Sequence, residues 1–248
     1  MTHDEQRLDE QVINKVAEIG LSSQVDEAEE VDVDIKTDLL KVVQGQVDSV
    51  DLSGQGVVIQ KDIRVQEMEL HTDKIDINPL SALFGQIELN KPVDATARLV
   101  LTEADINRAF NSDYVRSKLQ NIELNVDGKK AVIEPQQIRI EIPDKGKIVF
   151  FADTLLNNEI GATKQISFIA TILVKRSTQP LLLESFSCTP NQGISIELAI
   201  ALMQKLKELL NLPYLELDGM ALRVRDVDVQ KGSLTLHSEA RVKQIPSI

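Results

Sequence analysis

Residues 63–77, IRVQEMELHTDKIDI, and residues 93–101, VDATARLVL, decide the fold class of this chain. In both stretches apolar and polar side chains alternate; Met68 and Leu70, for example, are each flanked by charged or polar neighbours. A period of two places the apolar side chains on one face of a strand. The same period extends through most of residues 47–101, with turn signals between the runs. The pattern predicts an antiparallel meander with one apolar and one polar face.

Outside this stretch the chain combines further strand patterns with three helical ones. Strands continue in alternating pairs such as Ile138/Ile140 and Phe168/Ala170. Helical spacing occurs at residues 4–20, 103–119 and 196–210, and the second helix starts with a capping-box-like sequence at residue 102. The expected fold class is α+β. Because no Pro- or Gly-rich linker interrupts the sequence, we expect a single domain over residues 1–248.

A faint internal repeat suggests how such a domain is built. Residues 119–128 (LQNIELNVDG) and 210–219 (LNLPYLELDG) share a helix end, a strand and an Asp-Gly turn at the same spacing. Asp-Gly is a common hairpin turn, so one interpretation is two ordinary units. The other is a pair of pseudo-repeated halves, each a helix followed by a meander.

Composition and charge exclude several function classes. The chain is 42% hydrophobic but only 3% aromatic, with no Trp, so its apolar surfaces must be aliphatic. A chain with a formal charge of -12 lacks the basic footprint that nucleic-acid binding needs. An anionic membrane surface would repel it, so any peripheral membrane contact is expected to be apolar, local, or made by a minority basic patch. The N-terminus has no signal-like pattern and no apolar run reaches about 18 residues, so the expectation is a soluble, by default cytoplasmic protein.

The sequence contains no recognisable catalytic or metal-binding signature. His3, His71 and His237 lack zinc-type spacing and are expected at the surface, and Cys188 is expected to be a structural thiol. The acidic run at residues 26–34 lacks the central Gly and closing Glu of a calcium loop. The sequence therefore predicts no enzyme activity, no metal site and no cofactor.

Two apolar segments are candidates for contact with an apolar ligand. Residues 198–203 are six apolar residues in a row, which predicts a helix covered on most sides or facing a cavity. The expected ligand-lining residues are Ile106, Phe110, Leu198, Ile200, Leu202 and Met203. Residues 79–85, PLSALFG, are apolar where a connection should be polar. They form either a plug in the core or a lip made by Leu80, Leu83 and Phe84.

These patterns resemble a known family. Residues 42–85, the helix VLTEADINRAFNSDYVRSKL at 100–119 and the closing block LELDGMALRVRDVDVQKGSLTLHSEARV at 215–242 are similar to segments of the bacterial LmeA-like phospholipid-binding family. The resemblance covers about residues 10–245. It implies a tubular lipid-binding (BPI/TULIP-like) fold, in which curved antiparallel sheet wraps around two or three helices. It also implies phospholipid binding linked to the cell envelope. Many relatives carry an N-terminal signal or anchor, which this sequence does not show.

The leading hypothesis is therefore binding or transfer of phospholipid, or a similar acyl-chain ligand, in an aliphatic interior. Burial of acyl chains contributes roughly 0.8 kcal/mol per CH₂, so no special polar residue is needed. The alternative is a non-catalytic structural or adaptor protein with a filled core and an acidic surface. A third, weaker hypothesis is an enzyme of lipid or glycan metabolism. An open apolar interior distinguishes the first hypothesis from the second.

Overall fold

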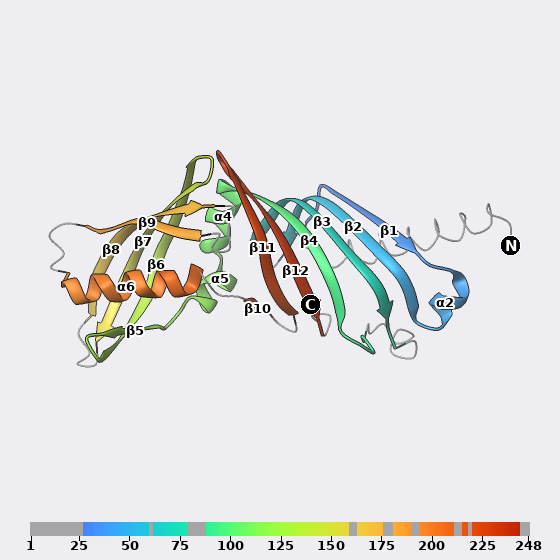
Figure 1. Cartoon of the computed structure of the whole chain (residues 1–248), viewed down its shortest axis with the longest axis horizontal. Coiled ribbons are helices and arrows are strands. Elements are labelled where there is room, and N and C mark those ends of the chain that lie inside the picture. Colours follow the sequence, from blue (N-terminus) through green and yellow to red (C-terminus); the bar gives the residue numbers. More distant parts are fainter. Residues whose placement is uncertain are drawn as a thin grey trace. The chain divides into compact units, whose positions relative to one another are not determined.

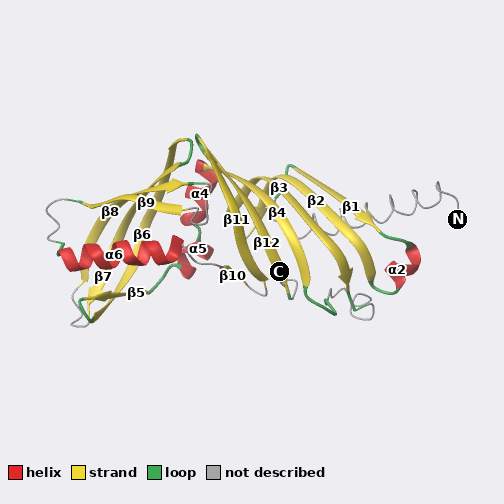
Figure 2. Cartoon of the chain, in the orientation of Figure 1, coloured by secondary structure: helices red, strands yellow, loops and turns green. Residues whose placement is uncertain are grey.

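The computed structural model describes residues 27–59, 62–78, 88–158, 163–175, 181–189, 194–210, 215–217 and 220–243. These residues form twelve strands and four helices, so strand predominates as expected for this α+β chain (Figures 1 and 2). The predicted helix at 4–20 and the predicted lip residues Leu80, Leu83 and Phe84 lie outside the described residues. The chain divides into two compact units. Unit 1 comprises residues 1–100, 213–226 and 235–248, and unit 2 comprises residues 101–212 and 227–234.

A seven-stranded antiparallel sheet makes up most of unit 1. Its order is β1-β2-β3-β4-β12-β11-β10. The strands are β1 (Glu30–Lys36), β2 (Gln46–Ile59), β3 (Ile63–Asp76), β4 (Val93–Thr102), β10 (Leu215–Leu217), β11 (Met220–Gln230) and β12 (Ser233–Val242). The helix α2 (Leu39–Val43) connects β1 to β2. The meander predicted from residues 47–101 is therefore confirmed.

Glycine has a local role in β2. Gly56 is buried and has a φ of +60°, a conformation that side chains with a Cβ rarely adopt. A Cβ there would also lie 2.5 Å from the Glu29 carboxylate. That carboxylate forms an ion pair with Arg64 at 2.8 Å. Glycine thus lets the chain before β1 lie against β2.

Unit 2 is built on a five-stranded meander in sequence order: β5 (Ile122–Val126), β6 (Lys129–Asp144), β7 (Lys147–Asn158), β8 (Thr163–Val174) and β9 (Leu181–Cys188). Asp127 and Gly128 join β5 to β6 with φ values of 51° and 78°, as a two-residue hairpin turn requires. Helix α6 (Ile196–Leu210) contacts both edge strands, β5 and β9. Its length of about 22 Å matches the roughly 19 Å between the edges of five strands, and Figure 1 shows it crossing the sheet.

The core of unit 2 lies between α6 and the sheet. Leu198 and Leu202 are 5% and 3% exposed, and they pack into one cluster with strand residues. The strand members of the cluster are Leu124, Ala131, Ile133, Ala152, Ile166 and Phe168. Cys188 is half-buried against it, a location that suits the predicted structural role, and burial raises the pKa of its thiol.

The predicted helix at 103–119 is instead two helices, α4 (Glu103–Phe110) and α5 (Asp113–Lys118). The capping box at Thr102 and Asp105 is present, as predicted. The break occurs because Ser112 caps a new helix: its Oγ accepts a hydrogen bond from the Val115 amide and donates one to the Ala109 carbonyl.

Helix α4 closes an open edge of β6. The Asn107 amide side chain accepts a hydrogen bond from Ile140 N at 2.7 Å and donates one to Ile140 O at 2.9 Å, as a neighbouring strand would. Glu103 Oε2 accepts a hydrogen bond from Ile142 N at 2.6 Å. Since β5 pairs with β6 only through Ile133, these side chains pair backbone groups that would otherwise be left open.

Helix α6 also differs from the sequence prediction of a helix covered on most sides. Ile196 is 75% exposed and Ile200 is 44% exposed. Leu198 and Leu202 face the sheet, and the opposite side of the same helix is open. The run of six apolar residues therefore contributes both to the buried side of α6, which packs on the sheet, and to its exposed side.

Candidate functional site

The seven-stranded sheet carries three apolar rows that cross β1, β2, β3 and β4. Directly opposite residues in a sheet share a face, and the register aligns each row in turn. The rows are Val31–Gly54–Met68–Leu99, Val33–Leu52–Leu70–Ala97 and Ile35–Val50–Thr72–Ala95. We call these twelve residues the apolar face. Their sequence alternation is what the meander prediction used, and the structure aligns it across four strands.

No described helix of unit 1 is large enough to cover the apolar face. Among the described residues of this unit, α2 is the only helix, and its five residues extend about 7.5 Å. The apolar face spans four strands, or roughly 14 Å. Four of its twelve residues, Val33, Gly54, Thr72 and Ala95, are buried, and the other eight are half-buried. The contrast with unit 2 is clear, because there a 15-residue helix packs on the sheet and fills its core.

The opposite face of the same strands is polar and hollowed. A depression of about 540 Å³ is lined by Leu52, Leu70 and Ala97 together with acidic, basic, imidazole and hydroxyl residues. The polar lining residues are Asp32, Asp34, Asp51, Ser53, Glu69, His71, Thr96, Arg98, Arg225, His237, Ser238 and Glu239. The volume of the depression suits a small molecule. The charges of its lining residues decide which kind of molecule it can bind.

Both arginines of this depression are already in ion pairs. Arg98 lies 3.3 Å from a Glu67 oxygen and 3.1 Å from a Glu69 oxygen. Arg225 is paired with Glu239. Since the remaining charged lining residues are mostly carboxylates, the depression does not attract a phosphate group.

His71 is held by carboxylates at both ring nitrogens. Its Nδ1 lies 2.5 Å from Asp51 Oδ1 and its Nε2 lies 3.3 Å from Asp73 Oδ1. The hydrogen bond to Asp51 is the main cause that raises the pKa of His71 and lowers the pKa of Asp51. Although Ser53 lines the same depression, the imidazole has no nitrogen left to take a serine proton. The side chain is 45% exposed, consistent with the predicted surface location.

Unit 2 contains an aromatic row that the sequence analysis did not identify. Phe110 of α4 meets Phe150 edge-on at 6.3 Å, and the row continues to Phe168 at 6.1 Å and Phe186 at 5.3 Å. Their spacing in the sequence could have revealed the row. Phe150, Phe168 and Phe186 are 18 residues apart, and each lies at an apolar position of the alternating pattern in three successive strands.

The predicted ligand-lining residues all lie on α4 and α6 of unit 2. Phe110 joins the aromatic row, Leu198 and Leu202 are in the core cluster, and Ile200 points away from it. Ile106 and Met203 are half-buried. The structure thus brings Phe110 and the α6 leucines to one apolar interior through Phe150 and Phe168.

Comparison with known proteins adds the decisive observation. The model of the LmeA-like phospholipid-binding family matches residues 4–239. The chain belongs to this family. No curated protein and no solved structure matches the chain. The match to the LmeA-like family extends through both units, so the apolar face and the unit 2 core both lie inside it.

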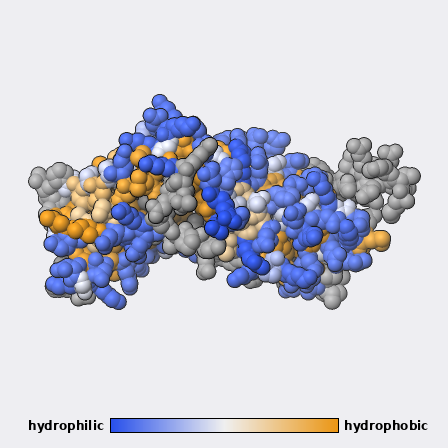
Figure 3. Space-filling view, in the orientation of Figure 1, coloured by the Kyte–Doolittle hydropathy of each residue, from blue (hydrophilic) through white to orange (hydrophobic). Residues whose placement is uncertain are grey.

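Two further findings bear on membership of a phospholipid-binding family. Within the described ranges, no three His, Cys, Asp or Glu side chains are grouped so as to hold a metal ion. None of the helices described is both long and apolar enough to cross a bilayer. Hydrophobic and hydrophilic residues are interspersed on the face of the molecule in Figure 3, where hydrophilic residues dominate.

Proposed function

We propose that this chain binds phospholipid by laying acyl chains on the apolar face of the seven-stranded sheet, and that it transfers lipid at the cell envelope. The observation that carries the proposal is an apolar face without a described helix large enough to cover it, in a member of a phospholipid-binding family. The head group stays at the edge of the sheet, because the depression on the opposite face is acidic.

The dimensions of the apolar face suit acyl chains. Three rows two residues apart extend about 14 Å along the strands, and four strands extend about 14 Å across. Two chains with about ten methylenes each, covered by the sheet on one side only, gain roughly 8 kcal/mol in gross transfer free energy, half the value for full burial. That gain is comparable with the roughly 4–15 kcal/mol cost of association. Aliphatic contact therefore supports weak, reversible binding.

We propose further that binding involves no covalent chemistry. The histidine best placed for general-base catalysis, His71, has both nitrogens occupied by carboxylates. The acidic depression around it has no unpaired cation for a phosphate group. Lining of a ligand by Ile106, Phe110, Leu198, Ile200, Leu202 and Met203 stays a prediction, with Leu198 and Leu202 also serving as core.

The test is a matched pair of double variants on the same two strands. Leu52 and Leu70 are directly opposite on the apolar face, and Ser53 and Glu69 are directly opposite on the polar face. Leu52→Asn/Leu70→Asn should reduce uptake of a fluorescent phospholipid at least about tenfold, while Ser53→Asn/Glu69→Gln should leave uptake unchanged. Circular dichroism confirms that each variant is folded.

Photolabelling locates the ligand without any substitution. A phospholipid with a diazirine at the acyl terminus should label peptides from β1–β4. Labelling confined to α4, α6 and β5–β9 would move the site into unit 2. Absence of labelling together with no fluorescent-lipid uptake would defeat phospholipid binding altogether.

A further inference from the structure

The helix α2 exposes large apolar side chains at the end of the sheet of unit 1. Leu40 is 71% exposed and Val43 is 77% exposed, and these two residues are three apart on the helix. Figure 3 shows a hydrophobic protrusion at the place that α2 occupies in Figure 1. Isolated exposed apolar residues are common, but here two of them lie together on a helix held in one position.

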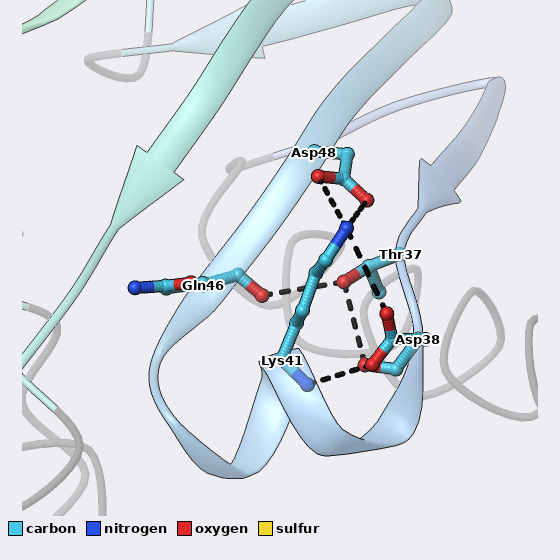
Figure 4. A network of polar contacts seen from close by, with 5 residues as sticks. All are labelled: Thr37, Asp38, Lys41, Gln46 and Asp48. Atoms are coloured by element: carbon cyan, nitrogen blue, oxygen red, sulfur yellow. Dashed lines mark hydrogen bonds and ion pairs between the residues drawn. The ribbon is translucent and has the colours of Figure 1, made fainter.

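A network of polar contacts, whose charged members are exposed, ties α2 to β2 (Figure 4). The Asp38 carboxylate accepts a hydrogen bond from the Lys41 amide at 2.9 Å, as an N-cap does. The Lys41 ammonium donates to the two Asp48 carboxylate oxygens at 2.9 and 2.7 Å, and these bonds raise its pKa. The charge of Lys41 is therefore engaged with Asp48 and Asp38, and the neighbouring side chains Leu40 and Val43 remain uncovered.

The ends of α2 are fixed as well. The Thr37 hydroxyl, which is buried, donates to the Gln46 carbonyl at 3.2 Å across the connection. Gly45 follows the helix with a φ of 77° and accepts a hydrogen bond from Ile77 N at 2.8 Å. The apolar side chains are thus presented on a helix tied to both β2 and the end of β3.

The position of α2 connects it to the proposed lipid site. The row Ile35–Val50 is the last apolar pair before the connection, and α2 begins four residues after Ile35. The apolar face and the exposed side chains of α2 therefore lie at the same end of β1 and β2. A lipid leaving a bilayer beside α2 would reach the apolar face first at this row.

The net charge of unit 1 limits the kinds of surface that α2 can contact. Unit 1 has 25 Asp and Glu against 13 Lys and Arg, whereas unit 2 has 14 of each. The entire formal charge of -12 thus belongs to unit 1. An anionic surface repels this unit. A surface without net charge accepts the apolar side chains and adds no repulsion.

The size of the exposed patch distinguishes a bilayer from a protein partner. A specific protein interface uses roughly 800 Å² and 20–30 residues on each side, far more than a helix of five residues offers. A bilayer needs no shape complementarity, and apolar side chains enter its interfacial region individually.

We propose that α2 is the membrane contact of this chain: Leu40 and Val43 insert into the interface of a bilayer with little net charge, next to the end of the apolar face. This inference rests on the proposed function, since it gives the lipid a route between bilayer and sheet. Lys41, Asp38 and Asp48 are positioning residues that hold the helix in its presenting conformation.

Tryptophan fluorescence tests the insertion directly, because the chain contains no Trp. The variants Val43→Trp and Ile196→Trp place one probe at a 77% exposed site on α2 and one at a 75% exposed site on α6. With phosphatidylcholine vesicles, the probe at position 43 should shift to shorter wavelength and be quenched by brominated acyl chains. The probe at position 196 should do neither. The reverse pattern would overturn the proposal.

Loss-of-contact variants use the same matched design. Leu40→Gln/Val43→Gln should lower the partition coefficient for these vesicles at least about tenfold, and Ile196→Gln, at a 75% exposed site on α6, should leave it unchanged. Glutamine is a good helix former, so both variants should fold. An α2 variant that partitions like the unmodified chain would overturn the proposal.

A second readout separates this inference from the proposed function. A short-chain phosphatidylcholine below its critical micelle concentration is monomeric, so its binding needs no bilayer contact. The α2 variant should bind it as the unmodified chain does, yet extract long-chain lipid from vesicles more slowly. If the unmodified chain does not bind the monomeric lipid, the proposed function fails. If it binds the lipid and the α2 variant extracts at full rate, only the membrane contact fails.

Discussion

Replacing Leu202 by alanine should destabilise unit 2 by about 3 kcal/mol. The side chain is 3% exposed and packs with Ile133, Ile166 and Phe168 under α6. Losing the equivalent of three methylene groups costs about 2.4 kcal/mol in transfer free energy, and the remaining cavity adds to this. Alanine and leucine have similar helix propensities, so the better propensity of alanine offsets only a few tenths of a kcal/mol of this loss. Urea unfolding followed by circular dichroism measures the loss, which should lower the midpoint by about 1 M.

The control is Ile200→Ala, two residues away on the same helix. Ile200 is 44% exposed and is not a member of the core cluster, so its removal should change the free energy of unfolding by less than about 1 kcal/mol. If Leu202→Ala changed uptake severalfold and left stability intact, Leu202 would line a ligand cavity, and the assignment of α6 to a filled core would be wrong.

Three further predictions concern local structure. Asn107→Ala should lower the free energy of unfolding by about 1–3 kcal/mol, measured in urea, because both backbone groups of Ile140 lose their partner. Gly56→Ala should cost about 1–2 kcal/mol at a φ of +60°, with an unchanged melting curve counting against the assigned conformation. His71→Asn should change the pH profile: the raised pKa of His71 means that its pairing with Asp51 stabilises the fold below pH about 6.5 and ceases to do so as pH rises through the folded-state pKa. The melting-temperature difference between the unmodified chain and this variant should therefore shrink from pH 6 to pH 9, and a constant difference would contradict the pairing.

The sheets were predictable because their signal is local. Alternation through residues 63–77 and 93–101 assigns each side chain to one of the two faces of the sheet. The register then aligns Val33, Leu52 and Leu70 in one row. The face of each residue follows from its own strand, so no long-range information is needed to assign it. The family resemblance, confirmed by the match over residues 4–239, rests on the same patterns. The expectation of an aliphatic surface open to lipid also follows from them.

What escaped sequence analysis depends on contacts between distant residues. Nothing near Asn107 in the sequence indicates that its amide pairs with a strand 33 residues away. The break after α4 depends on Ser112 acting as a cap, and a serine inside a helical pattern has several other roles. No helix is predicted from the sequence for residues 39–43, and nothing in the sequence indicates that Leu40 and Val43 are exposed. Their exposure follows from the network around Lys41.

The division of charge was also hidden in the total. A value of -12 for the whole chain suggests an evenly acidic surface, but residues 1–100 alone hold 21 Asp and Glu against 9 Lys and Arg. Residues 213–226 and 235–248, which complete unit 1, add four of each and no net charge. A count of charges by segment would therefore have located the excess without the structure.

Native mass spectrometry of the purified chain, followed by organic extraction, tests the central claim most directly. After incubation with phosphatidylcholine vesicles, the folded chain should carry added mass equal to whole phospholipid molecules. Extraction should return that lipid chemically unchanged. The Leu52→Asn/Leu70→Asn variant should carry much less, and the Ser53→Asn/Glu69→Gln variant should carry as much as the unmodified chain. A folded chain that stays lipid-free under these conditions, or that holds equal lipid in both variants, would contradict binding on the apolar face.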